Sequence, residues 1–342
     1  MAVTHGGDIY SAKRSMPDTN FIDFSANINP FGTPEKIKNA VRKSIDMIDI
    51  YPDIRCSDFC GAAARYHSVD ADFICAGNGA ADIIFRLVYA VRPRRAAVCA
   101  PTFGEYAQAL SDVGCAVVTY TEDSLGENID GADMVFICNP NNPTGTLTDG
   151  AAIENIVKKH SDVLFVIDEC FLDMTWCEKD CSMINKVHLY SNIWVLKSLT
   201  KMYALAGLRI GYGICSDTKL CARVRNTGQP WAVSSAAQAA GIAAFECENE
   251  KSAFLNMLDA EKIYMYGALS ELGLEVKRPS ANFVFFRARG TYDLKERLLA
   301  RGILIRSCAD YDGLDASFYR VCIRTHSENE MLINAIREVL YG

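Results

Sequence analysis

The chain has 342 residues, of which 50% are hydrophobic, 23% are charged and 10% are aromatic. This composition excludes disordered and fibrous proteins, and the length exceeds what one hydrophobic core usually organises, which predicts a large domain with a smaller second domain. The net charge of -7 gives no overall attraction to nucleic acid or anionic membranes, so neither is expected as a partner.

The first 33 residues are rich in Gly, Asn, Pro and Ser and show little periodicity, which predicts a loop-like arm. Residues 1–7 lack a basic region followed by an apolar stretch, so no targeting segment is expected. A helix is predicted to begin near Pro34 and to end before Tyr51-Pro52-Asp53. Its apolar residues follow at helical spacing: Ile37, Val41, Ile45 and Ile48.

Short apolar runs alternate with helical stretches between residues 72 and 215, which predicts an α/β domain with a largely parallel sheet covered on both faces. The predicted strands are residues 95–100, 115–120, 134–138, 163–167 and 193–196. In such sheets, ligands bind beyond the carboxyl ends of the strands, so the polar residues that end these runs are candidates for a site.

The last third of the chain predicts a smaller α+β domain. A long helical stretch is expected over 233–272, strands over 282–286 and 318–323 with a helix between them, and a terminal helix near 327–340. We therefore predict an arm and helix over 1–50 that contribute to the small domain, a large domain over 51–232, and the small domain proper over 233–342. No internal repeat or low-complexity linker is present.

The fourteen cysteines are scattered through apolar runs. Disulfide frameworks belong mainly to short secreted chains, so we expect buried, reduced thiols and a cytoplasmic protein. The pairs Cys56/Cys60 and Cys177/Cys181 have no neighbouring residues that would complete a zinc site, and no metal is expected. No run reaches the roughly 18 apolar residues that a membrane span needs.

Three predicted strand ends carry polar motifs: Asn139–Gly145, Asp168-Glu169 and Ser198–Lys201. Taken singly, such motifs are more often a turn, a helix cap and a surface lysine. Their order and spacing, together with the segment from Lys201 to Tyr212, resemble the cofactor-lysine region of fold-type I pyridoxal-phosphate (PLP) enzymes, which have the aspartate-aminotransferase fold. The resemblance spans essentially the whole chain and is closest to the branch of histidinol-phosphate aminotransferases and threonine-phosphate decarboxylases.

This resemblance implies roles for the three strand ends. Lys201 would carry PLP as a Schiff base and then act as general base or acid at the substrate α-carbon. Asp168 would pair with the protonated pyridine nitrogen, which deepens the electron sink of the ring. Asn142 would donate a hydrogen bond to the phenolic oxygen. Phe171 stands where aminotransferases usually have a tyrosine that donates a second one.

Recognition of the PLP phosphate is implied at a predicted helix N-terminus. Gly79 and Ala80 precede the helical pattern over 81–91 and would offer backbone N–H groups. The resemblance adds two hydroxyls and a guanidinium, from Ser198, Thr200 and Arg209. Tyr51 is similar to the tyrosine that related enzymes lend to the phosphate of a neighbouring subunit, which implies a homodimer with shared sites. Phe103 would stack on the PLP ring or else belong to the core.

Arginines near the C-terminus are candidates for binding anionic groups of the substrate. Arg320 resembles the arginine that binds the α-carboxylate in this superfamily, and Arg306 resembles a second substrate arginine of the phosphate-handling branch. Arg324 lies four residues after Arg320 on a predicted strand, so the two would face one side about 13 Å apart, although Arg324 could equally form a structural ion pair.

The opening of the chain resembles that of threonine-phosphate decarboxylases, in His5-Gly6-Gly7 and in the segment 23–32 that contains Asn29. His5 and Asn29 are therefore candidates for substrate binding, with a disordered terminus as the alternative for His5. Residues 229–233 also resemble this branch. Asp8 and the Ala81-Asp82 pair depart from the pattern expected of it.

The predicted reaction is PLP-dependent decarboxylation of O-phospho-L-threonine, or of O-phospho-L-serine, to an aminoalkyl phosphate for the cobalamin lower-ligand linker. Transamination of the histidinol-phosphate type is the alternative, because the bond held perpendicular to the PLP ring decides the reaction and no motif reveals it. A PLP-binding regulatory module is disfavoured, since the first 50 residues contain no basic DNA-binding unit.

Overall fold

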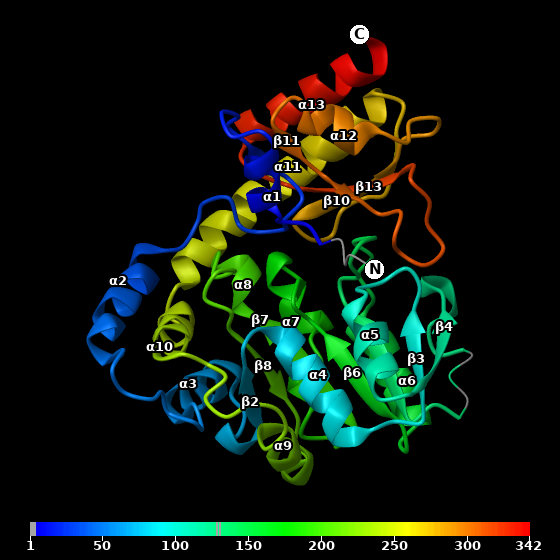
Figure 1. Cartoon of the computed structure of the whole chain (residues 1–342). Helices are drawn as coiled ribbons and strands as arrows, with labels where there is room; N and C mark the ends of the chain where they lie inside the picture. The colour runs from blue at the N-terminus through cyan, green and yellow to red at the C-terminus, as the bar shows by residue number, and fades with distance from the viewer. Residues whose placement is uncertain (1–4, 128, 130) are drawn as a thin grey trace.

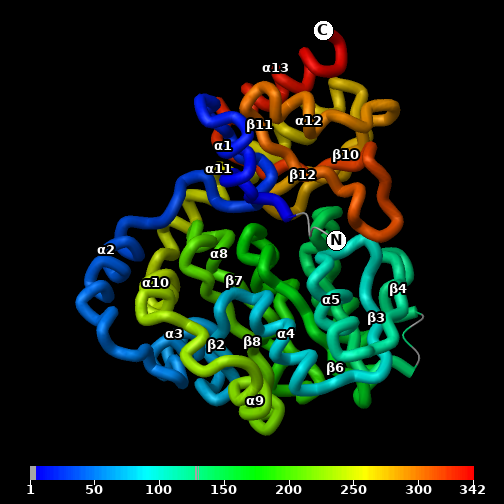
Figure 2. Tube along the Cα trace, in the orientation of Figure 1, coloured from blue at the N-terminus to red at the C-terminus, as the bar shows by residue number. Residues whose placement is uncertain are grey.

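The computed structural model describes residues 5–127, 129 and 131–342. The described chain forms two lobes, and its start lies where the lobes meet (Figures 1 and 2). Residues 1–4, part of the stretch in which no targeting segment is expected, lie outside the described residues. No helix of the described chain is long and apolar enough to cross a membrane.

A seven-stranded sheet forms the centre of the larger lobe (Figure 1). Its order is β2 (Ile74–Gly77), β8 (Gly211–Ile214), β7 (Ile193–Ser198), β6 (Leu164–Asp168), β5 (Met134–Cys138), β3 (Arg95–Cys99) and β4 (Ala116–Tyr120). The strands from β7 to β4 run parallel, and β8 is antiparallel to both of its neighbours. The prediction of a largely parallel sheet is therefore confirmed.

The strands predicted from the sequence did not include β2 and β8, which are short. Glycines at two of the four positions of β8 weaken the apolar pattern. The glycine at 213 is required by packing, because a Cβ atom there would lie 2.4 Å from Nε1 of the buried Trp194. Gly213 thus weakens the sequence signal of β8 and also allows β8 to pack against the indole ring of Trp194 on β7.

Helices cover both faces of this sheet. α4 (Ala80–Val91), α5 (Glu105–Asp112) and α9 (Thr218–Arg225) bury apolar side chains with Phe136, Val166 and Trp194 on one face. On the opposite face, α3 (Ser57–His67), α6 (Gly150–Lys159) and α10 (Ser235–Ala244) pack with Phe165, Ile167 and Val195. This alternation of neighbouring residues between two apolar layers explains why the central strands read as nearly continuous hydrophobic runs.

The smaller lobe contains a four-stranded antiparallel sheet in the order β12 (Arg306–Ser307), β13 (Phe318–Cys322), β10 (Phe283–Arg287) and β9 (Glu275–Val276). The helices of this lobe are α11 (Glu248–Glu271), α12 (Leu294–Leu299) and α13 (His326–Tyr341). α13 begins with a capping box between Thr325 and Glu328, a signal that the sequence carries locally.

Three expectations about secondary structure were wrong. The N-terminal arm contains the helix α1 (Ile9–Ser15), which Asp8 caps, and β1 (Ile22–Asp23), which pairs with β11 (Ile303–Leu304). The stretch 233–272 is two helices, interrupted over 245–247. The helix after Pro34, α2 (Glu35–Ser44), packs against α10 and gives way to a 3-10 turn over 45–47, which leaves Ile45 and Ile48 exposed. The domain boundaries remain predictions.

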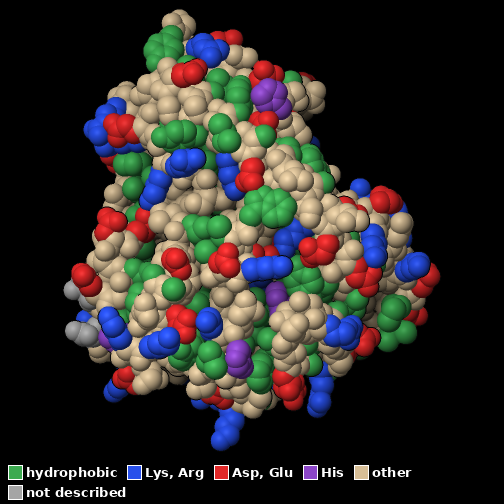
Figure 3. Space-filling view, turned by 180° about the vertical axis from the view of Figure 1, so that it is seen from behind, with side chains coloured by type: hydrophobic (Ala, Val, Ile, Leu, Met, Phe, Trp, Pro, Cys, Tyr) green, Lys and Arg blue, Asp and Glu red, His purple; other side chains and the backbone are tan. Residues whose placement is uncertain are grey.

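The charged surface and the burial of the cysteines can both be compared with what the composition predicts. On the face shown in Figure 3, acidic and basic side chains are interspersed rather than gathered by sign. Across the described chain every cysteine is a free thiol, and all except Cys177 are buried. The prediction that the thiols are buried is therefore confirmed for thirteen of the fourteen, and their reduced state stays a prediction.

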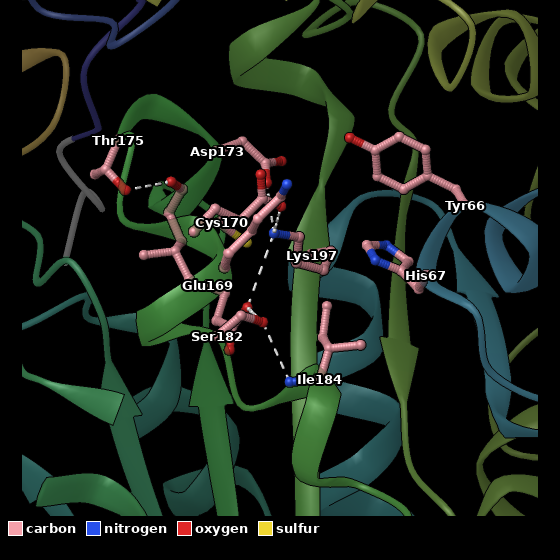
Figure 4. A network of polar contacts seen from close by, with 12 residues as sticks. Tyr66, His67, Glu169, Cys170, Asp173, Thr175, Ser182, Ile184 and Lys197 are labelled. Atoms are coloured by element: carbon pink, nitrogen blue, oxygen red, sulfur yellow. Dashed lines mark hydrogen bonds and ion pairs between the residues drawn. The ribbon is translucent and has the colours of Figure 1, made fainter. Parts of the chain in front are cut away.

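A buried cluster of charges surrounds Lys197 of β7 (Figure 4). Since neighbouring strand residues alternate between the two apolar layers, this cluster lies on the sheet face opposite to the side chain of Asp168. The ammonium group of Lys197, which is 1% exposed, lies 2.5 Å from Asp173, 3.3 Å from Glu178 and 3.8 Å from Glu169. Glu178 also binds Lys251 of α11 at 2.6 Å. The cluster therefore holds the segment 169–178 against β7 and ties α11 to the sheet.

Burial alone would lower the pKa of Lys197, but Asp173, Glu178 and Glu169 hold it well above its usual value. Burial raises the pKa of Glu169 to about 7, although Ser182 and the backbone N–H of Met183 both donate hydrogen bonds to it. The ammonium group of Lys197 is thus the positive charge that compensates three carboxylates of one segment, of which Glu169 and Asp173 are buried and Glu178 is partly exposed.

Replacement of Lys197 by Met would leave these carboxylates without that cation. We expect Lys197→Met to lower the free energy of unfolding by about 3–5 kcal/mol, because breaking a buried ion pair leaves uncompensated charge. Lys197→Arg keeps the charge and is expected to cost much less. Urea denaturation at neutral pH, followed by circular dichroism, measures both changes.

Lys186→Met is the matched control, since Lys186 forms a 3.2 Å ion pair with Glu154 and its side chain is 39% exposed. Its effect should stay within about 1 kcal/mol, as for other surface pairs. Equal losses in the Lys197 and Lys186 variants would contradict a special role for the buried cluster.

Candidate active site

The three polar motifs converge at the carboxyl edge of the central sheet. Cys138, Asp168 and Leu196 are register neighbours on β5, β6 and β7, so the segments that follow these strands lie side by side. Lys201 lies in α8 (Leu199–Met202), directly after β7. Parallel strands thus bring together side chains that are up to sixty residues apart in the chain.

The amine of Lys201 lies near two guanidinium groups. Its removal from water, together with the nearby guanidinium groups of Arg320 and Arg209, lowers its pKa. A lowered pKa increases the fraction of neutral amine, which is the form that attacks a carbonyl carbon. The ring centroid of Phe171 lies 6.0 Å from Nζ, so one side of this amine is apolar.

Asp168 is buried and held in one orientation by two donors. The hydroxyl of Tyr106 donates to Oδ2 at 2.5 Å, and the backbone N–H of Cys170 donates to Oδ1 at 2.9 Å. Burial and the Asp168 carboxylate together raise the pKa of Tyr106, which keeps it a donor. Sequence reasoning missed Tyr106, because its spacing on α5 does not distinguish it from a core aromatic residue.

A cradle of donors forms where α4 begins. Gly79 is the N-cap residue of α4 with φ +85°, and a Cβ atom there would lie 2.6 Å from Nη2 of Arg209. The hydroxyls of Ser198 and Thr200 lie 2.7 Å apart. Helix N–H groups, two hydroxyls and a guanidinium are the donor set that suits a phosphate dianion, and the missing Cβ leaves the approach clear.

The loop that carries Asn142 is fixed by its neighbours. The side-chain oxygen of Asn142 accepts a hydrogen bond from Nη1 of Arg320. Asn141 donates to Glu122 at 2.8 Å and to the carbonyl of Pro101 at 2.9 Å, and Lys277 of the small lobe binds Glu122 at 2.6 Å. The loop is therefore held from both lobes, with Asn142 next to a buried arginine.

The two aromatic candidates pack against other rings of the described chain. Phe103 lies edge-on to Tyr106, with 5.5 Å between centroids, and is only partly buried. Phe171 lies edge-on to Phe283 at 5.1 Å. Phe103 is thus close to the partner of Asp168, and Phe171 is close to Lys201.

Arg306 and Arg320 are direct register partners on the antiparallel strands β12 and β13. Both are buried, and Arg320 donates to the carbonyl of Ser25 at 2.8 Å while its Nε atom has no partner in the described chain. Arg306 forms an ion pair with Asp310 at 2.7 Å. Side chains opposite each other in antiparallel strands share one face, so both guanidinium groups lie on the same side of this sheet, and that of Arg320 is also near the amine of Lys201.

Arg324 does not join this pair. The expectation that Arg320 and Arg324 share one strand face was wrong, because β13 ends at Cys322. Arg324 pairs with Glu328 at 2.7 Å and donates to the carbonyl of Asp23 at 3.2 Å, which is the structural ion pair considered as the alternative.

The N-terminal arm crosses the same region. His5 lies 2.8 Å from Glu105, and the N–H of Gly7 donates to Ser25 at 2.7 Å. A Cβ atom on Gly6 would lie 2.0 Å from the carbonyl oxygen of Ser25 and 3.4 Å from Nη2 of Arg320. The described part of the arm therefore packs tightly against the residues that hold Arg320.

Asn29 and Tyr51 occupy contrasting positions. The side chain of Asn29 donates to the carbonyl of Met202 at 2.9 Å, and its backbone N–H donates to the carbonyl of Lys201 at 3.1 Å, so Asn29 supports the lysine segment. Tyr51 is 77% exposed and stacks on Trp231 with 4.6 Å between centroids. Within the described chain Tyr51 makes no hydrogen bond or ion pair with the donor cradle.

The comparisons with known proteins agree with this geometry. The family model for aminotransferase class I and II matches residues 19–336. The chain is 39% identical to a threonine-phosphate decarboxylase of Salmonella typhimurium, covering 99% of this chain and 97% of that protein.

Two solved structures are similar over nearly the whole chain. One is the L-threonine-O-3-phosphate decarboxylase from Porphyromonas gingivalis, with a TM-score of 0.88, 25% identity and coverage of 95% of this chain and 100% of the other. The second is the histidinol-phosphate aminotransferase from Clostridium acetobutylicum, with a TM-score of 0.87, 29% identity and coverage of 93% and 98%. This chain belongs to the aminotransferase class I and II family.

Proposed function

We propose that this protein is a PLP-dependent carboxy-lyase that converts O-phospho-L-threonine, or O-phospho-L-serine, to the aminoalkyl phosphate and carbon dioxide, in the synthesis of the cobalamin lower-ligand linker. The observation that carries the proposal is the buried register pair of Arg306 and Arg320, of which Arg320 lies near the amine of Lys201. Two adjacent guanidinium groups suit a substrate that bears two anionic groups, a carboxylate and a phosphate.

The cofactor of this family is PLP, which supplies an electron sink for charge that develops at the substrate α-carbon. Lys201 would hold it covalently, Asp168 would meet its pyridine nitrogen and Asn142 its phenolic oxygen, with Phe103 against its ring. The cradle at the start of α4 would bind its phosphate through Gly79, Ala80, Ser198, Thr200 and Arg209. The glycine at 79 and the donor set of this cradle support that assignment.

We assign the polar groups of the proposed site to binding, orientation or proton transfer. Arg320 binds the α-carboxylate, because it is buried and, within the described chain, forms no ion pair with a carboxylate. Arg306 and His5 bind the phosphate. When the carboxylate leaves as carbon dioxide, the ammonium form of Lys201 donates a proton to the α-carbon. Tyr106 keeps Asp168 oriented throughout.

Transamination of the histidinol-phosphate type is the second candidate. It is favoured by the similarity to the histidinol-phosphate aminotransferase structure, at 29% identity. The same lysine and arginines would serve both reactions, since Lys201 can move a proton at the α-carbon in either of them. The two functions differ in whether a keto acid is required.

The first experiment measures carbon dioxide release by the PLP-loaded protein from O-phospho-L-threonine and from O-phospho-L-serine, with glutamate formation from 2-oxoglutarate assayed in parallel. We expect carbon dioxide without any keto acid. The methyl group that separates the two substrates is worth about 1–3 kcal/mol, so their kcat/KM values should differ by about 10- to 200-fold at most. Amino transfer that depends on a keto acid, without carbon dioxide, would overturn the decarboxylase proposal.

Replacement of Lys201 tests the proposed attachment of the cofactor. Lys201→Ala is expected to show no visible absorbance band of lysine-bound PLP and to lose at least about 1,000-fold in kcat, because the covalent anchor and the proton donor are both removed. Lys219→Ala, on an exposed turn of α9, is the control and should retain the band. A normal band in Lys201→Ala would place the attachment elsewhere.

We also propose a homodimer in which Tyr51 reaches the PLP phosphate of the neighbouring subunit. An exposed apolar surface surrounds Tyr51, and such surfaces commonly mark protein interfaces. It comprises Ile45, Met47, Ile48, Ile50, Tyr51, Ile54 and Trp231, with exposures from 44% to 82%.

A charge placed in this surface should disrupt the dimer. Ile48→Lys is expected to weaken dimerisation at least about tenfold, measured by sedimentation velocity, because the new charge would be buried on association. Its affinity for PLP should fall in parallel. Ile263→Lys is the control, since Ile263 is 72% exposed on α11, outside this surface. A dimer unaffected by Ile48→Lys would contradict the assignment of this interface.

A further inference from the structure

Arg306 and Arg320 create an electrostatic problem before any substrate binds. They face each other across β12 and β13, and both side chains are nearly removed from water. Like charges directly opposite each other on adjacent strands destabilise a sheet, and a buried guanidinium without a partner is costly. The protein must therefore supply anions or strong acceptors at this place.

The two arginines meet this requirement differently. Arg320 donates to neutral oxygens, those of Asn142 and Ser25. Nη2 of Arg306 instead donates to both carboxylate oxygens of Asp310, at 2.7 and 2.8 Å, and its guanidinium lies 5.3 Å from the ring centroid of Tyr311. In this structure Arg306 is thus occupied by an internal carboxylate.

The carboxylate of Asp310 is in a position from which it can be displaced from Arg306. Its side chain is 43% exposed, against 9% for Arg306, and it lies in the segment 308–317 that connects β12 to β13. A second carboxylate near Arg306 is that of Glu105, which lies in the first turn of α5, is bound to His5 and is only 15% exposed. Of the two, the carboxylate on the exposed segment is the one that can move away from Arg306.

We propose that Asp310 is an internal competitor for the phosphate of the substrate: its carboxylate occupies Arg306 in the free enzyme and must be displaced when the phosphate binds. This inference rests on the proposed function, in which Arg306 meets the phosphate. Asp310 then sets the affinity for anionic substrates without taking part in the chemistry. It keeps Arg306 charged, buried and paired until a dianion arrives.

A conservative substitution of Asp310 should tighten the binding of phosphate. Asp310→Asn keeps the shape of the side chain and removes its charge, so the phosphate no longer competes with a carboxylate. If the paired state holds about nine-tenths of the free enzyme, binding tightens by up to about tenfold. We expect the Kd for inorganic phosphate and the KM for O-phospho-L-threonine to fall together, with kcat unchanged.

The experiment uses the PLP-loaded enzyme, so that the cofactor cradle is already filled. Isothermal titration calorimetry gives the Kd for inorganic phosphate, and carbon dioxide release gives KM and kcat. Asp312→Asn is the matched control, because Asp312 is exposed on the same segment and the substitution makes the same change in net charge. It should leave both constants unchanged within about twofold, since exposed charges are screened.

A double-mutant cycle shows whether the effect passes through Arg306. In an Arg306→Gln background, Asp310→Asn should no longer tighten phosphate binding, because the pair it relieves is absent. Unchanged, weaker or undetectable phosphate binding by Asp310→Asn would overturn the proposal and make Asp310 a residue that orients Arg306. Tightening that persists without Arg306 would overturn it as well.

The same measurements distinguish failure of the proposed function from failure of the competition by Asp310. If the wild-type enzyme releases no carbon dioxide from O-phospho-L-threonine, but Asp310→Asn still tightens phosphate binding through Arg306, the decarboxylase assignment is wrong and the competition by Asp310 holds. If carbon dioxide is released and KM does not fall in Asp310→Asn, the competition is wrong and the decarboxylase assignment holds.

Discussion

The ion pairs of Lys197 are the interaction on which the rest of the site depends. Lys197 on β7 is surrounded by three carboxylates of one segment, and that segment begins immediately after Asp168 on β6. The strand that leads to Lys201 and the strand that ends in Asp168 are therefore locked together from the face opposite to the Asp168 side chain. The separation between Lys201 and Asp168 is therefore fixed by buried charge rather than by a loop.

A group of cationic side chains lies on the same side of the sheet as Asp168 and in the adjoining part of the small lobe. Lys201, Arg209, Arg306 and Arg320 come from both lobes, and removal from water together with the nearby Arg320 and Arg209 guanidinium groups lowers the pKa of Lys201. Cations gathered in one region favour ligands with several negative charges, such as PLP and a phosphorylated amino acid. The protein limits the cost of this arrangement by assigning internal partners: carbonyl and amide oxygens to Arg320, and the Asp310 carboxylate to Arg306.

Contacts between distant parts of the chain complete the site. The N-terminal arm packs on Ser25, which holds Arg320 of β13, and Asn29 of the same region binds the backbone of Lys201. Lys277 of the small lobe binds Glu122, which supports the loop of Asn142. Both lobes and the arm therefore set the positions of Lys201 and Arg320, so a movement of the small lobe would change the surroundings of both side chains together.

The sequence by itself determined the α/β fold with its largely parallel sheet, because apolar periodicity reports which face of an element is buried and where a strand ends. The resemblance of its motifs to a known family supplied the family and the candidates Lys201, Asp168 and Asn142. Only the tertiary structure decided which distant residues meet. It paired Tyr106 with Asp168, Arg306 with Arg320 and Asp310 with Arg306, removed Arg324 from the strand, and placed helix α1 in the predicted loop. The physical reason is that a hydrogen bond or ion pair between residues far apart depends on sheet register and lobe packing, which leave no periodic signal in either segment.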